Sequence, residues 1–127
     1  MPPLHRQPEV EAAIRTEFDR LVNLTADELI AWLETPESRK VGMTRRGESV
    51  SVGRQSARAI LAIRAKSESD LTDSDYVHMR KVIGFCRRHL AQRPWGDVAD
   101  TRWRWSLMNW GHDPLRGRQS GLSEPSS

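Results

Sequence analysis

Residues 72–93, TDSDYVHMRKVIGFCRRHLAQR, carry the clearest helical pattern in the chain. Thr72 followed three residues later by Asp75 matches a capping box, and Pro94 ends the helix because proline cannot continue its hydrogen bonds. The apolar side chains recur every three or four residues and share one face: Tyr76, Met79, Val82, Ile83, Cys86 and Leu90. The segment therefore predicts a long amphipathic helix that packs by this face against a core.

The same helical period appears in three segments upstream. The first helix is expected to begin at Pro8, and its apolar stripe is Val10, Ile14, Phe18, Leu21 and Val22. A second, short helix begins at Thr25, which forms a capping box with Glu28, and Pro36 ends it or starts a new turn. A third helix runs from Val52 to Lys66. All three predict further layers around the long helix.

Residues 94–114, PWGDVADTRWRWSLMNWGHDP, hold four of the five tryptophans, with arginines between them. They predict a fifth helix from Thr101 to Trp110, stopped by Gly111. One face of this helix carries Trp103, Leu107 and Trp110. Trp105 points the other way, with Met108 beside it. A helix with two apolar faces either lies sandwiched between other elements or leaves one face for a partner.

Together these segments predict an all-α protein, a compact bundle of about five helices. We expect one domain over residues 8–114, a flexible N-terminus over residues 1–7 and a disordered Gly/Ser/Pro-rich tail over residues 115–127. No apolar run reaches the roughly 18 residues of a membrane span, and the N-terminal stretch lacks a secretory signal. The single cysteine, Cys86, excludes an internal disulfide. A cytoplasmic location is therefore expected.

Positive charge gathers in the middle of the chain. Residues 1–36 have a net charge of −4, whereas residues 37–66 have +6. A basic loop, PESRKVGMTRRGES at residues 36–49, has room for one helical turn and precedes the third helix, and both later helices carry basic side chains opposite their apolar faces. The expected basic surface is Arg39, Lys40, Arg45, Arg46, Arg54, Arg58, Arg80, Lys81, Arg87 and Arg88. Such a surface favours DNA binding through phosphates, largely independent of sequence.

The tryptophan helix adds a second candidate element. Arg102 and Arg104 flank Trp105, so the arginines are expected to contact phosphates while the ring stacks on a base. The helices at 52–66 and 72–93 could also form a helix-turn-helix-like pair, although their link is longer than the turn of that motif. The alternative is a protein–protein or homodimerisation module that uses the tryptophan-rich segment and leaves the basic residues solvated.

Catalytic and metal patterns are weak. His78, Cys86 and His89 lie close together on one helix but lack the spacing of a metal motif. His112 and Asp113 could act as a base and its orienting group, but no nucleophile accompanies them. The sequence therefore predicts no enzyme, no metal and no cofactor.

The runs LTDSDYVHMRKVIGFCRRHLAQRP and GDVADTRWRWSLMNWGHDP, with TADELIAWLETPESRKVG and SVGRQSAR upstream, carry a family resemblance. Over roughly Thr25 to Pro114 the chain resembles an uncharacterised family of small actinobacterial and fungal proteins, catalogued as a domain of unknown function. Some of its members are labelled DNA-binding, so the resemblance implies DNA association. It implies no catalytic residues.

Overall fold

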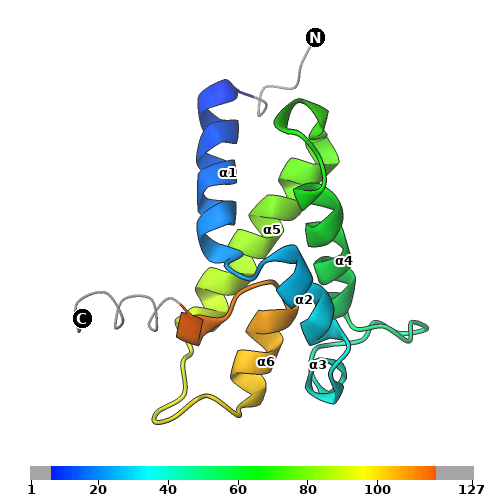
Figure 1. Ribbon diagram of the computed structural model, residues 1–127, viewed down its shortest axis with the longest axis vertical. Coiled ribbons are helices and arrows are strands. Elements are labelled where there is room, and N and C mark those ends of the chain that lie inside the picture. Colours follow the sequence, from blue (N-terminus) through cyan, green and yellow to red (C-terminus); the bar gives the residue numbers. More distant parts are fainter. Residues whose placement is uncertain (1–6, 117–127) are drawn as a thin grey trace.

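The computed structural model describes residues 7–116, and every regular element in that range is helical (Figure 1). The elements are α1 (Pro8–Leu21), α2 (Ala26–Leu33), α3 (Pro36–Lys40), α4 (Val52–Arg64), the 3₁₀ turn η1 (Glu68–Asp70), α5 (Asp73–Leu90) and α6 (Arg102–Asn109). The all-α prediction is confirmed. None of these helices is both long and apolar enough to cross a membrane.

Local sequence signals set the helix ends. The capping boxes of Thr25 with Glu28 and of Thr72 with Asp75 are both present, each with reciprocal hydrogen bonds. These bonds satisfy backbone N–H groups that a helix start otherwise leaves without partners. Gly111 follows α6 with φ +81°, a left-handed conformation that suits glycine. The predicted starts of α2 and α5 and the predicted stop of α6 are thus confirmed, whereas α5 ends at Leu90, before the expected stop at Pro94.

Helix α5 is the central element of the bundle. Figure 1 shows it running diagonally between α1 and α4, both of which pack against it. Helix α6 contacts α2, α3, α4 and α5 at the lower end of the view. The tryptophan helix is therefore sandwiched, and its predicted core face of Trp103, Leu107 and Trp110 is buried. These large side chains bury apolar surface in the core.

Two parts of the chain refine the sequence prediction, which allows one helical turn in the basic loop. The basic loop contains a distinct helix, α3, because Thr35 caps Ser38 and Pro36 occupies its first turn. The segment expected to be a tail begins with two packed residues: Leu115 lies against the core, and Arg116 pairs with Glu28. The other residues expected to be flexible, 1–6 and 117–127, lie outside the described part of the chain.

A buried polar cluster ties the small helices together. Asn109 of α6 accepts hydrogen bonds from Trp32 Nε1 (2.8 Å) and Ser38 Oγ (2.6 Å), and its Nδ2 donates to the Ser38 carbonyl (3.1 Å). Arg54 of α4 donates to Ser38 Oγ (2.7 Å) and to the Leu33 carbonyl (2.8 Å). Because buried polar groups need partners, this cluster fixes α2, α3, α4 and α6 in one arrangement.

Candidate functional site

Exposed cations gather around the junction of α3, α4 and α6. Arg39 and Lys40 end α3, and Arg102 at the start of α6 donates a hydrogen bond to the Lys40 carbonyl. On α4, burial lowers the pKa of Arg54, and the positive charges of Arg39 and Arg58 lower it further. The guanidinium groups of Arg39 and Arg58 therefore lie close enough to Arg54 to disfavour its positive charge. Three elements thus bring basic side chains to one region.

The four cations of α5 do not form one face. Lys81 and Arg88 line a cavity together with Gly42 and Met43, which places them beside the loop that carries Arg45 and Arg46. Arg80 and Arg87 instead line a groove against α1. There Arg87 pairs with Glu17 at 2.9 Å. Only two of the four therefore join the basic residues of α3 and its loop.

Two of the predicted arginines are engaged inside the protein. Arg104 makes a bidentate pair with Asp113 (3.1 and 3.0 Å) and donates to the Ala99 carbonyl (2.9 Å). Burial alone would raise the pKa of Asp113, but the Arg104 hydrogen bonds and neighbouring charges lower it on balance. Arg54 is held in the buried polar cluster around Asn109, where it donates to Ser38 Oγ and to the Leu33 carbonyl. Neither is free to contact phosphates as the sequence had suggested.

The exposed tryptophan is not the one expected. Trp105 is half-buried, and Met108 beside it packs against the core. Trp95 is 99 % exposed instead, in the loop between α5 and α6. It stands in the sequence Pro94-Trp95-Gly96, and a tryptophan in such a turn has no helix face through which to become buried. That local context was the signal that sequence reasoning missed.

We define the basic face as the cations that remain exposed around the junction of α3, α4 and α6: Arg39, Lys40, Arg45, Arg46, Arg58, Lys81, Arg88 and Arg102. Within residues 7–116, the one carboxylate within 4.0 Å of any of these groups belongs to Glu48, opposite Arg45. Several cations elsewhere are paired with carboxylates, as Arg20 with Glu17 and Lys66 with Asp75. The basic face therefore carries most of the uncompensated positive charge of the described chain.

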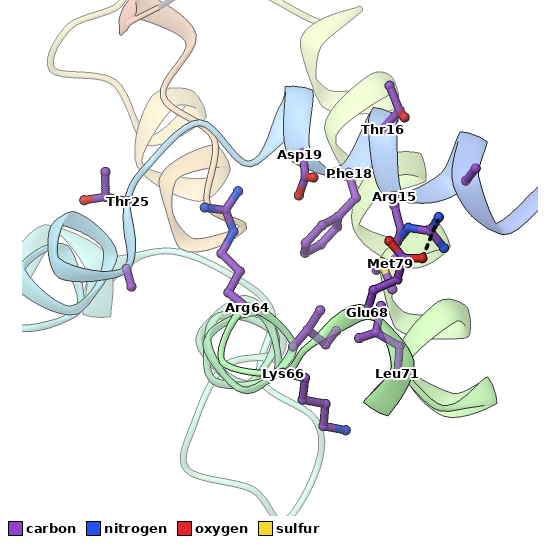
Figure 2. Close-up of a pocket in the computed structure, with 13 residues that line it drawn as sticks. Arg15, Thr16, Phe18, Asp19, Thr25, Arg64, Lys66, Glu68, Leu71 and Met79 are labelled. Carbon is purple, nitrogen blue, oxygen red and sulfur yellow. Dashed lines mark ion pairs between the residues drawn. The ribbon is translucent and has the colours of Figure 1, made fainter.

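A large cavity, about 650 Å³, lies between α1 and α4 (Figure 2). Phe18 and Met79 contribute apolar surface, and Arg15 bridges to Glu68 at 3.4 Å and to the Tyr76 hydroxyl at 2.7 Å. Its other cations are also engaged, since Arg64 donates to the Val22 carbonyl and Lys66 pairs with Asp75. Each cation of this cavity therefore has a partner within the fold.

The residues considered for metal or acid–base chemistry have structural partners. His78 pairs with Ser56 Oγ (2.9 Å), His89 with the Trp103 carbonyl (3.1 Å) and His112 with the Leu21 carbonyl (2.6 Å). Burial lowers the pKa of all three histidines and raises that of Cys86 to about 12. A thiol with that pKa stays protonated at neutral pH. Within the described residues, no three such groups lie close enough to hold a metal ion.

Comparison with known proteins gives one match. The family model described as "protein of unknown function (DUF3140)" matches residues 17–108, which is more than half of the chain. The matched range includes the whole basic face and ends one residue before Asn109. No curated protein and no solved structure matches the chain.

Proposed function

The chain belongs to the DUF3140 family of proteins of unknown function, and we propose that it is a non-catalytic, cytoplasmic protein that binds duplex DNA through the basic face. The supporting observation is the number of exposed cations without a carboxylate partner around α3, α4, α5 and α6. Guanidinium and ammonium groups of this kind contact phosphates and release counterions on binding. The helix α1, by contrast, carries acidic side chains and keeps Arg20 and Arg87 paired through Glu17.

The start of α4 supports binding that is independent of base sequence. A recognition helix presents free polar side chains near its N-terminus. Here Gln55 donates to Glu48 (2.9 Å) and to the Val50 carbonyl (2.8 Å), while Arg54 is held by Ser38 and Leu33. These side chains are committed to the fold. The link from α4 to α5 also contains the turn η1, which a helix-turn-helix motif lacks.

Charge-matched variants test the proposal. Binding of a fluorescently labelled duplex of mixed sequence is measured by anisotropy at low salt. We expect the double variant Arg46→Gln/Arg58→Gln to bind about tenfold more weakly or worse, because it removes two potential phosphate contacts. The control Arg20→Gln/Arg80→Gln changes the net charge equally but outside the basic face, and should retain most of the affinity. Equal losses in the two variants, or no binding by the unaltered protein, would contradict the proposal.

A second candidate function is protein binding or self-association through the loop between α5 and α6. The observation that favours it is the full exposure of Trp95, because tryptophan is enriched at the centres of interfaces. Sedimentation velocity of the unaltered protein and of Trp95→Ser tests it. A concentration-dependent dimer that Trp95→Ser abolishes would support this function, and a monomer with no difference between the two would remove self-association through Trp95.

A further inference from the structure

A second, smaller cavity opens beside the basic face. Its volume is about 270 Å³, just below the roughly 300–1,000 Å³ of pockets that hold drug-sized ligands. Its lining includes Met43, Val52, Phe85, His89 and Trp110. These mostly apolar walls suit a small molecule with an apolar body.

The aromatic wall of this cavity is a row of stacked rings. Phe85 is stacked with Trp110 (centroids 4.3 Å apart) and with His89 (5.0 Å), and Trp110 is also stacked with His78 (6.4 Å). Such rings offer apolar surface to the body of a ligand.

One hydrogen-bond donor at the wall has no acceptor. Trp110 is 6 % exposed, and its indole N–H makes no hydrogen bond within the described residues. The indoles of Trp32 and Trp103 both have acceptors, at 2.8 and 2.7 Å. Trp110 Nε1 lies beside Gly53, which also lines the cavity, and a Cβ at Gly53 would be 3.1 Å from it. No fully buried side-chain nitrogen or oxygen of the described residues lacks a partner, so Nε1 itself is accessible, and this donor is available to an acceptor on a ligand.

Two exposed cations border the same cavity. Lys81 and Arg88 are both lining residues, and within residues 7–116 neither has a carboxylate within ion-pair distance. The hydroxyl of Ser106 is a further polar group on the wall. The cavity thus combines an apolar interior, one unused indole donor and two uncompensated positive charges. Together these features favour a ligand with an apolar body and a negatively charged acceptor group.

We propose that this cavity binds a small organic acid with an apolar body and one carboxylate. The carboxylate accepts a hydrogen bond from Trp110 Nε1 and is attracted by Lys81 and Arg88, while the apolar body contacts Met43 and Val52. The inference goes beyond DNA binding and does not depend on it, although Lys81 and Arg88 belong to both sites.

Titration with benzoate, followed by NMR of the ¹⁵N-labelled tryptophan indoles, tests the proposal. We expect the assigned Trp110 indole signal to shift to saturation, while those of Trp32 and Trp103 stay in place because their N–H groups are already bonded. Acetate, which lacks the apolar body, and benzyl alcohol, which lacks the charge, should bind about tenfold more weakly or worse. An unmoved Trp110 signal, or equal binding of benzyl alcohol, would overturn the proposal.

Variants test which side chains bind benzoate. Lys81→Gln should weaken benzoate binding about tenfold, whereas Arg80→Gln, its neighbour on the α1 side, should not change it. Gly53→Ala should also weaken binding, because the added methyl group occupies the space beside Trp110 Nε1. The indole spectrum of each variant verifies that it is folded. Equal effects of Lys81→Gln and Arg80→Gln would contradict the proposal, and duplex binding measured on the same proteins reports separately on DNA association.

Discussion

Replacing Asn109 by alanine removes the centre of the buried polar cluster. Its side chain is 1 % exposed and makes three hydrogen bonds, two with Ser38 and one with Trp32. Each buried group that loses its partner costs about 1–3 kcal/mol. The two Ser38 groups are fully buried, whereas the half-buried Trp32 indole regains some hydration and contributes near the lower limit. We therefore expect Asn109→Ala to lower the free energy of unfolding by about 3–5 kcal/mol.

Urea denaturation followed by circular dichroism measures this loss, and a double-mutant cycle tests its cause. Trp32→Phe removes one donor to Asn109 together with some packing. In the Asn109→Ala background this hydrogen bond is already absent, so Trp32→Phe should cost less there. The loss of unfolding free energy in the double variant should therefore be about 1 kcal/mol smaller than the sum of the two single losses. A loss below about 1 kcal/mol for Asn109→Ala, or additivity within about 0.3 kcal/mol, would refute the view that this cluster holds the small helices together.

Three further perturbations follow from single features of the fold. Gly111→Ala should lower the free energy of unfolding in urea by about 2–4 kcal/mol, because φ is +81° and the new Cβ would lie 2.8 Å from Val22 Cγ1. The control Gly47→Ala, with φ +84° and open space around the new Cβ, should lower it by only about 1 kcal/mol. Equal losses in the two variants would contradict this reasoning. Trp95→Ser should leave the urea midpoint unchanged, since the ring is fully exposed, and a clear loss would show that it packs in solution. Burial lowers the pKa of three histidines in the folded protein, so on acidification the unfolded chain binds protons at these side chains before the folded protein does. The free energy of unfolding should therefore fall as the pH drops below about 6.5, by up to about 1.4 kcal/mol per pH unit for each histidine. The three are His78, His89 and His112. Urea midpoints that stay constant between about pH 8 and about pH 5.5 would contradict the assignment of neutral, buried histidines.

The helices could be predicted because their signals are local. Thr72 and Asp75 are three residues apart, and a capping box needs nothing beyond that spacing. The apolar period of α5 likewise identifies its buried face without knowledge of its partners. Helix α3 was less visible, because five residues are too few to show a period and the stretch is polar throughout.

The candidate site could be predicted only in part, because it depends on contacts between distant residues. Arg54 and Arg104 look like free basic side chains in the sequence, yet Ser38 and Asp113 engage them in the fold. Lys81 and its neighbour Arg80 are equally basic, but the positions of α1 and the α3–α4 loop decide which one joins the basic face. No local pattern reveals such pairings, since they are set by how the helices pack.

The salt dependence of duplex binding tests the central claim most directly. The basic face offers eight cations, and each phosphate contact contributes about −0.9 to the slope of log affinity against log salt concentration. If five to seven of them make contact, the slope is about −4 to −6. The account predicts a slope in this range, made shallower by roughly two contacts in Arg46→Gln/Arg58→Gln and unchanged in Arg20→Gln/Arg80→Gln. A slope shallower than about −1, or the same slope in both variants, would contradict it.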